Sequence, residues 1–411
     1  MAFIKPFKCI RPTKQNAADV AALPYDVYNR EEACEEVKDK PLSFLNIDRA
    51  ETQFDASVDT YADCVYDKAR ELLDKAIADG VFVEDDEEAY YIYELTMDGR
   101  AQTGIVACAS IDDYLNNRIK KHEKTRADKE VDRINHVDRT SAQTGPIFLA
   151  YRAHDAINEV VDRVKEEDAL YEFVSDDGIK HAVWKISKLD DVKTIFDAFD
   201  SINSIYIADG HHRAASAVKV GLKRREENPD YDGSEEFNTF LSVLFPDEQL
   251  MIMPYNRVVK DLNGLSVDEY LEAITKYFQV EKCGKKAFYP EEKGSFGMYL
   301  EEEWYLLTAK ESITSEDPVD GLDVAILQDY LLTPVLGIGD PRIDKRIDFI
   351  GGIRGLGELE RRVATDMKIA FSMYPTSIHE LFDVADADML MPPKSTWFEP
   401  KLRSGLFIHR I

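Results

Sequence analysis

The stretch "SIYIADGHHRAASAV", Ser204 to Val218, decides the fold that this sequence predicts. It opens with a run of β-branched and aromatic residues, which is typical of a buried strand. The run ends at Asp209-Gly210, and glycine accepts backbone angles that residues with a Cβ resist. Two histidines, Arg213 and a series of alanines follow, which favours a helix that starts near His212. The stretch therefore predicts a strand, a tight turn and a helix in direct succession.

This strand-to-helix turn has the composition of an anion site. The first amides of a helix have no acceptor within the helix and lie at the positive end of its dipole. A phosphate placed there would also meet Arg213, whose guanidinium can donate two parallel hydrogen bonds to phosphate oxygens. His211 or His212 could donate to the same group or transfer a proton, because the imidazole pKa lies near neutral pH. We therefore predict a phosphate or nucleotide site formed by Asp209, Gly210, His212 and Arg213.

Two other interpretations of the turn stay open. Asp209 could cap the helix while His211 and His212 bond to neighbouring backbone. The two histidines could instead bind a metal ion, with Asp209 as the third ligand. Adjacent residues on a helix rarely chelate one ion well, which weakens this second alternative.

The elements around the turn indicate an α+β fold. Apolar residues at helical spacing predict helices over 29–38, capped by Asn29, and within 57–80. Residues 89–111 and 171–186 each hold two strand-like runs around an Asp-Gly turn, which predicts two hairpins. The run "LSFLNIDR", residues 42–49, predicts a further strand. Strands that arrive in hairpins favour α+β over a regular βαβ succession.

A fresh alternation of strands and helices begins after Pro246, which predicts two domains, residues 1–246 and 247–411. In the second of these we expect a helix over 266–277, a strand over 278–282, a hairpin over 296–307 and a helix over 322–332. The tail "MPPKSTWFEPKLRSGLFIHRI" contains Lys401 and Arg403 among aromatic residues. It could reach an acidic ligand, or it could fasten the C-terminus to the core.

The composition narrows the range of partners. The 411 residues include 79 acidic and 51 basic side chains, for a formal net charge of −28. Such a charge repels nucleic acid and anionic membrane surfaces, so we expect neither as a partner. Five scattered cysteines without a Cys-x-x-Cys pair suit a reducing compartment. No apolar run approaches the 18 residues of a membrane span, and the N-terminus lacks a signal peptide pattern. We therefore expect a cytoplasmic protein.

The segment Arg118 to Arg139 stands out in this acidic chain, with eight basic and five acidic residues. It could bring His122 and Lys124 to the same phosphate, with Arg126 as a further cation. Glu123 could accept the proton of a substrate hydroxyl. The alternative is a solvated helix stabilised by its own ion pairs.

Two aspartates elsewhere are weaker candidates. Asp26 follows Pro24 in a predicted turn and could bind a substrate amine or a metal, or act as a base. Asp48 would lie just past the end of the strand over 42–49, a frequent place for site residues. Each is equally explained as a turn-forming residue.

The glycine-rich stretch "DFIGGIRGLGELE", Asp348 to Glu360, is a third candidate. Its glycines could cradle an anion beside Arg354. It matches neither the dinucleotide-binding fingerprint nor the P-loop pattern, so tight packing of a connection is the competing explanation.

The sequence resembles a family of proteins of unknown function, the domain of unknown function 1015 family, over essentially its whole length. The segments that carry this resemblance include "LPYDV", "PLSFLNIDR", "HEKT", "DGHHR", "GIGDPRIDKRIDFIGGIRG" and "YPTSIHELFDVAD". The motif "IADGHHRAASA" is also similar to the strand–turn–helix motif of the ParB and sulfiredoxin-like superfamily, in which this turn holds nucleotide phosphates. Within that superfamily, the turn resembles that of the ADP-dependent free serine kinases.

The departures from these relatives limit what the resemblance implies. Sulfiredoxins carry a catalytic cysteine where this chain has His211, so sulfiredoxin chemistry is not expected. ParB proteins use basic surfaces for DNA, which the net charge here opposes. The shared feature is the phosphate grip from Gly210 to Arg213, within a ParB/sulfiredoxin-like N-terminal part.

The resemblance implies a nucleotide-dependent kinase of a small hydroxylated metabolite, with free serine as a candidate. ATP, ADP or another nucleotide would supply the phosphoryl group, and Mg²⁺ near Asp209 or Asp26 would accompany it. The alternatives are a non-catalytic nucleotide or metabolite sensor and a ParB-like regulator. Whether identical chains associate stays open.

Overall fold

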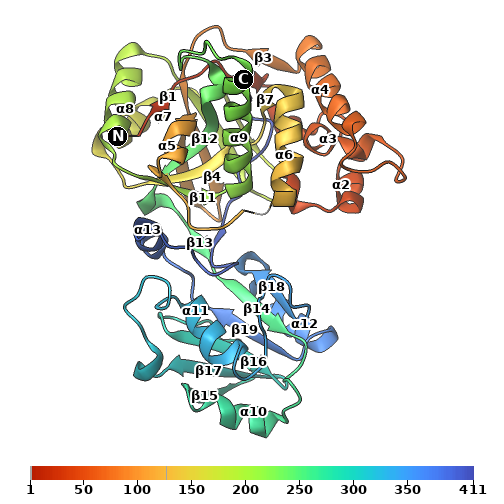
Figure 1. Cartoon of the computed structure of the whole chain (residues 1–411), viewed down its shortest axis with the longest axis vertical. Coiled ribbons are helices and arrows are strands. Elements are labelled where there is room, and N and C mark those ends of the chain that lie inside the picture. Colours follow the sequence, from red (N-terminus) through yellow and green to blue (C-terminus); the bar gives the residue numbers. More distant parts are fainter. Residues whose placement is uncertain (1, 126) are drawn as a thin grey trace. The chain divides into compact units, whose positions relative to one another are not determined.

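The computed structural model describes residues 2–125 and 127–411, the side chains of 127–129 excepted. It divides into two compact units (Figure 1). The first contains Met1–Leu250 and Pro400–Ile411, and the second contains Met251–Glu399. The last twelve residues, which the sequence analysis placed in the second domain, thus pack with the first unit.

The first unit is built on a mixed sheet in the order β6–β11–β8–β12–β5–β4–β10–β9, with β1 added beside β5. The β11–β6 and β12–β8 pairs are parallel, and the other pairs are antiparallel. These strands are β1 Ile4–Lys5, β4 Tyr90–Met97, β5 Arg100–Ser110, β6 Ile119–Lys120, β8 Ile147–Tyr151, β9 Tyr171–Val174, β10 Lys180–Ile186, β11 Ile205–Asp209 and β12 Thr239–Pro246.

The two hairpins predicted in this unit are confirmed as β4–β5 and β9–β10. In the first, Asp98 and Gly99 both have positive φ, at 51° and 79°. Two such residues form the turn whose twist matches that of the flanking strands, which is why Asp-Gly marks it in the sequence. Two short strand pairs complete the unit: β2 Ile10–Pro12 with β3 Phe82–Glu84, and β7 Ala142–Gln143 with β21 His409–Arg410.

The helices of the first unit include the two predicted near the N-terminus. Asn29 caps α2 in a reciprocal capping box with Glu32, as its position suggested. Helices α6 and α9 lie side by side (Figure 1). The helices are α1 Ala17–Val20, α2 Arg30–Glu36, α3 Leu45–Asp48, α4 Asp63–Ala78, α5 Ile111–Leu115, α6 Ala127–Thr140, α7 Asp155–Lys165, α8 Leu189–Ser201 and α9 His211–Glu227.

The strand predicted over 42–49 is wrong, because this segment forms the short helix α3. Phe44, Leu45 and Ile47 pack into one hydrophobic cluster with residues of α4, such as Val65 and Ala69. A short apolar run does not distinguish a strand from a buried helix, and tertiary packing decided the outcome here.

The second unit has its own sheet, in the order β15–β17–β16–β19–β14–β18, and a short pair, β13–β20. The predicted hairpin is confirmed as β16–β17. The helix predicted over 322–332 is α11 followed by a π-helical turn, Gln328–Leu332. Its elements are β13 Ile252–Met253, β14 Tyr255–Val259, α10 Val267–Ile274, β15 Phe278–Gly284, β16 Ser295–Leu300, β17 Glu303–Ala309, α11 Asp323–Leu327, β18 Ile347–Gly351, α12 Gly355–Thr365, β19 Ile369–Met373, α13 Ile378–Asp386 and β20 Trp397–Phe398.

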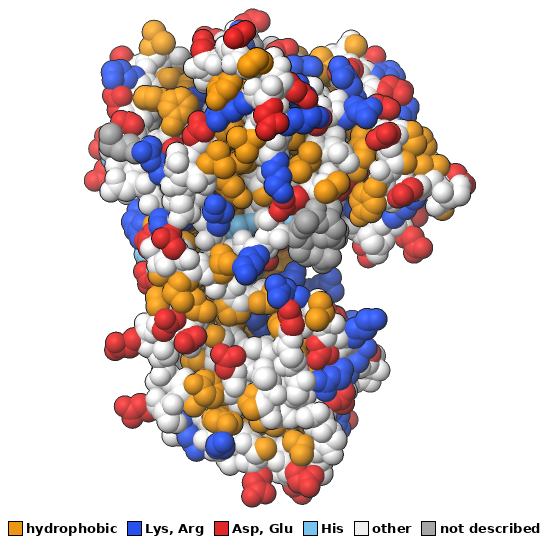
Figure 2. Space-filling model, in the orientation of Figure 1, with side chains coloured by type: hydrophobic (Ala, Val, Ile, Leu, Met, Phe, Trp, Pro, Cys, Tyr) orange, Lys and Arg blue, Asp and Glu red, His pale blue; other side chains and the backbone are white. Residues whose placement is uncertain are grey.

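Helices and sheets made largely of antiparallel pairs confirm the α+β class. None of the helices in the described part of the chain is both long and apolar enough to cross a bilayer. Figure 2 shows acidic and basic side chains interspersed over the visible face of each unit, and no single large basic surface is seen there.

Candidate functional site

The predicted strand, turn and helix are β11, Gly210 and α9. Gly210 is the N-cap of the 17-residue helix, and no side chain caps it. The first turn of α9 contains no acidic residue. Asp209 is thus not the N-cap residue, although its carboxylate accepts a hydrogen bond from the Gly210 amide directly before the helix. The positive end of the α9 dipole therefore has Asp209 beside it but no carboxylate from its own first turn.

Glycine is required at position 210 for two reasons. Its φ is +91°, which side chains rarely tolerate. A Cβ there would also lie 3.0 Å from the guanidinium of Arg213, which folds back over the turn. Arg213 donates to the carbonyl of Pro146 and, at 3.4 Å, to Asp209 Oδ2. Contacts with the turn and with Pro146 thus hold Arg213 beside the predicted phosphate site.

Asp209 is held between two cations. Lys401 Nζ, from the C-terminal tail, lies 3.5 Å from Asp209 Oδ2, opposite the contact with Arg213 described above. Although burial favours the protonated acid, these positive charges keep the pKa of Asp209 well below its ordinary value. The basic tail thus contacts an aspartate of the first unit, which agrees with the alternative that the tail fastens the C-terminus to the core. The predicted role of Asp209 as a metal ligand has to compete with both cations.

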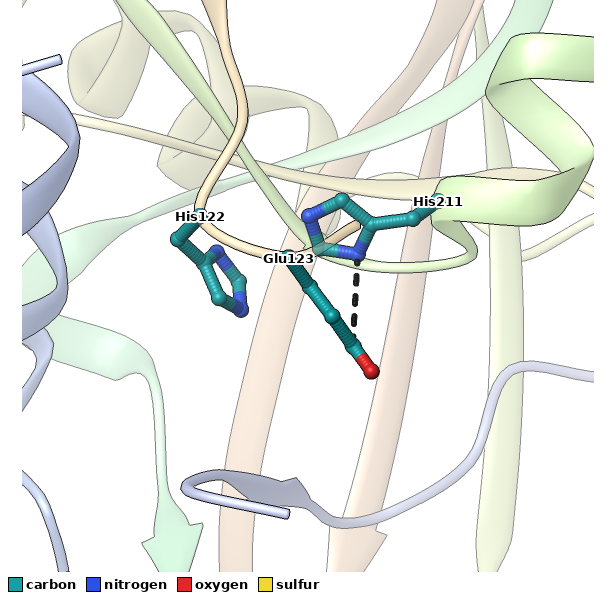
Figure 3. A group of neighbouring side chains, drawn as sticks. All are labelled: His122, Glu123 and His211. Atoms are coloured by element: carbon teal, nitrogen blue, oxygen red, sulfur yellow. Dashed lines mark ion pairs between the residues drawn. The ribbon is translucent and has the colours of Figure 1, made fainter. Parts of the chain in front are cut away.

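The two histidines of the turn do not act as a pair, because His211 faces His122 instead of His212. Strand β6 pairs in parallel with β11, with Lys120 opposite Tyr206, and this brings the loop after β6 to the turn. The rings of His122 and His211 meet edge to face, with centroids 4.5 Å apart. Glu123 Oε2 lies 3.9 Å from His211 Nδ1 (Figure 3).

Burial controls the charge of both imidazoles. His122 is 3% exposed and His211 is 5% exposed. Loss of water disfavours the imidazolium and lowers the pKa of His122 to about 4. Burial, together with the neighbouring His122, places the pKa of His211 well below its ordinary value. Both rings are therefore neutral at physiological pH. Unlike these buried rings, the Glu123 side chain is 48% exposed.

The remaining predicted residues differ in exposure. His212 is half-buried and Lys124 is exposed. Asp26 is exposed in the 3-10 turn Tyr25–Val27. Arg126 lies outside the described residues.

A pocket of about 490 Å³, partly open to solvent, borders the turn on the Arg213 side. Two of its residues, Arg133 and His136, lie one turn apart on α6 and were not singled out by the sequence analysis. Arg133 is buried over the ring of Tyr25, 3.9 Å from its centroid. The i, i+3 spacing within the basic segment was the signal that could have found them. The lining residues include Tyr25, Asp48, Arg133, His136, Thr144, Arg213 and Ser404.

Polar side chains that line this pocket form hydrogen bonds and ion pairs with neighbouring residues. Thr144 donates a hydrogen bond to Asp48 Oδ1 at 2.9 Å. Asp48 is buried in the helix α3, so the expectation that it follows the end of a strand is wrong. Arg133 pairs with Asp132 at 2.8 Å, and although burial opposes the charge, this carboxylate raises the pKa of Arg133 above its ordinary value. Arg133 and Arg213 thus both line this pocket, each beside a carboxylate partner, Asp132 and Asp209, and Asp48 adds a further carboxylate.

Comparison with solved structures gives only distant similarities. A free serine kinase in complex with AMP shares 12% identity over 73% of this chain and 91% of its own, with a TM-score of 0.33. SbnI with a C-terminal truncation, from Staphylococcus aureus, shares 10% over 72% of this chain and 85% of its own, with a TM-score of 0.35. A conserved hypothetical protein from Pyrococcus furiosus shares 13% over 74% and 94%, with a TM-score of 0.32. Similarities this low carry no inference about function.

A search of curated proteins found no match. A family model described as "Protein of unknown function (DUF1015)" matches residues 4–325, which is most of the 411-residue chain. The chain therefore belongs to this family, as its sequence motifs indicated.

Proposed function

We propose that this member of the family binds nucleotide phosphates at the β11–α9 turn and transfers a phosphoryl group to a small hydroxylated metabolite. ATP or ADP is the expected donor, and free serine is the first acceptor to test. The observation that carries the proposal is the turn itself. The N-terminus of α9, at a left-handed glycine without a side chain, lies beside Arg213 and Lys401.

The local charge supports an anionic ligand. In a chain of net charge −28, a phosphate needs a site where cations gather. Arg213, Lys401 and Arg133 supply three cations around the turn and its pocket, and Asp209, Asp48 and Asp132 supply three carboxylates, so the charge is locally balanced in a strongly acidic chain. Most of the space of about 490 Å³ beside Arg213 is open to solvent, and only about 30 Å³ of it is cavity volume, room for roughly one or two water molecules. The phosphates would therefore bind at the turn itself and not inside this pocket.

The proposed reaction assigns a role to each group. The amides after Gly210, with Arg213 and His212, would hold the phosphates, and His122 and Lys124 would approach from the β6–α6 loop. The acceptor hydroxyl oxygen would bond to phosphorus as the bond to the nucleotide oxygen breaks. Its proton would pass to Glu123 or Asp26, and a divalent cation would balance the phosphate charge. Such transfer depends chiefly on alignment and charge neutralisation.

The test uses the full chain and two assays. Thermal unfolding with ADP, ATP and CTP should show a concentration-dependent stabilisation, because a ligand that binds only the folded state raises its stability. Phosphoryl transfer is then measured across a set of amino acids and sugars. Stabilisation without transfer would favour a sensor and overturn the kinase assignment, and no stabilisation by any nucleotide would overturn the site.

A further inference from the structure

His122 and His211 are buried, and each has a ring nitrogen without a use in the fold. Within the described part of the chain, His122 Nδ1 and His211 Nε2 are buried and have no hydrogen-bond partner. A buried polar atom left unpaired costs free energy, so two of them in adjoining rings require an explanation. A ligand bound through Nδ1 of His122 would satisfy that atom.

We infer that His122, Glu123 and His211 bind one divalent transition-metal ion. The three side chains come from two segments, the loop after β6 and the start of α9, which the parallel β6–β11 pair holds together. Figure 3 shows the Glu123 carboxylate and the His211 ring facing each other, with the His122 ring beside them. One ligand atom from each residue can be chosen so that all three lie within 4.8 Å of one another.

The geometry needs only a small closure around the ion. Bonds of about 2.0–2.2 Å to a tetrahedral ion separate the donor atoms by roughly 3.3–3.6 Å. Glu123 Oε2 and His211 Nδ1 are already 3.9 Å apart, so the ion would bind this ring through Nδ1 and leave Nε2 unpaired. Glu123 is 48% exposed, so its side chain can move to complete the site at little cost.

The donor set selects the class of metal. Mg²⁺ and Ca²⁺ prefer oxygen ligands, whereas two imidazoles and one carboxylate suit Zn²⁺, Fe²⁺ and similar ions. Three protein ligands also leave coordination positions open. The inference rests on the proposed function at one point: phosphate oxygens of the nucleotide would occupy these open positions on the ion. The assignment makes Glu123 a ligand and leaves the role of base to Asp26.

The test measures metal content without nucleotide. The full chain is dialysed against Zn²⁺, and separately against Mg²⁺, and bound metal is counted by elemental analysis. We expect one Zn²⁺ per chain and no retained Mg²⁺. Co²⁺ bound in place of Zn²⁺ should absorb in the visible range without a thiolate charge-transfer band. Such a band would instead place the ion at exposed cysteines, Cys34 or Cys64.

Substitutions of the three proposed ligands and of a control histidine test whether Zn²⁺ binds at this site. His122→Asn and His211→Asn should abolish Zn²⁺ retention, and Glu123→Gln, at an exposed side chain, should weaken it about tenfold or more without unfolding the chain. His154→Asn is the matched control. His154 is the N-cap residue of α7, without a side-chain capping bond, and its Nδ1 is likewise buried and unpaired. It follows β8 at the opposite end of the β8–β11 pair from Asp209.

Zn²⁺ retention that is unchanged in both Glu123→Gln and His211→Asn would overturn the inference, as would equal losses in the His154→Asn control. Because no nucleotide is present, a failure here leaves nucleotide binding untouched. A chain that holds Zn²⁺ but binds no nucleotide would overturn only the proposed function.

Discussion

Two strand-to-helix turns in this molecule share a glycine with positive φ and a nearby arginine, yet they differ in what surrounds them. In the first unit, Gly210 (φ +91°) joins β11 to α9 beside Arg213. In the second, β18 passes through the 3-10 turn Gly352–Arg354 to Gly355 (φ +69°), where α12 begins.

The second turn is a packed connection. A Cβ on Gly351 would lie 2.8 Å from the indole of Trp397, and one on Gly352 would lie 2.7 Å from the ring of Pro254. Arg354 is 67% exposed and lies 4.0 Å from Glu358 of its own helix. Around Gly210, by contrast, side chains from the β6–α6 loop and the C-terminal tail converge. A glycine-rich turn thus becomes a candidate site only where distant segments bring charge and imidazole to it.

Arginine removal gives the largest expected difference between the two turns. Arg213→Ala should weaken nucleotide binding roughly 10- to 100-fold, the effect of losing charge-assisted hydrogen bonds worth about 1.5–3 kcal/mol. Arg354→Ala should leave it unchanged. Calorimetric titration of each full-length variant with ADP checks both, and an affinity that survives Arg213→Ala would place the nucleotide elsewhere.

Glycine substitution separates structural cost from ligand binding. Gly210→Ala and Gly355→Ala should each lower the free energy of unfolding by about 1–3 kcal/mol, because both backbones are strained for a residue with a Cβ. Only Gly210→Ala should also weaken nucleotide binding, since its Cβ would displace Arg213. Urea unfolding and ligand titration measure the two effects, and equal loss of binding in both variants would erase the contrast.

The second unit should show its own pH dependence, independent of nucleotide. Burial raises the pKa of Asp323, at the start of α11, from 3.8 to about 7. The folded state therefore binds this proton more tightly than the unfolded chain, and stability from this group falls as the pH rises from about 4 to 7. Asp323→Asn should flatten this slope in urea unfolding at pH 5 and pH 8. A slope unchanged by the substitution would mean that another group titrates.

The smallest effect is expected at Glu123. Its carboxylate is 48% exposed and lies 3.9 Å from His211, so Glu123→Gln should change the unfolding free energy by no more than about 0.5 kcal/mol. Chemical denaturation checks this. A large loss of stability would show that the β6–α6 loop depends on this carboxylate for its structure.

Local sequence signals predicted most of the helices and strands discussed above, but not all the residues that meet at the candidate site. The β11–α9 turn followed from a β-branched run, Asp-Gly and a helix-forming segment, and the hairpins followed from Asp-Gly between alternating runs. The segment 42–49 failed because Phe44 and Leu45 bury equally well in a helix. Local interactions determined the turn and the hairpins, which were predicted correctly. Tertiary packing determined the segment 42–49, which was not.

The sequence predicted that His122 and Glu123 approach the turn, but not the direct contact between the His122 and His211 rings. This contact depends on β6, a strand of two residues within a charged segment, that pairs with a strand more than eighty positions away. Periodicity does not identify so short a strand. Lys401 reaches Asp209 for a similar reason, because the tail returns to the first unit after the whole of the second. Non-local pairing of this kind leaves no mark in local composition.

Amide hydrogen exchange of the full chain, with and without saturating ADP, tests the central claim most directly. We predict that ADP slows exchange in peptides spanning Gly210–Ala215, and that peptides spanning Gly351–Gly355 exchange at unchanged rates. Protection at the second turn, or none at the first with ADP bound, would contradict the account.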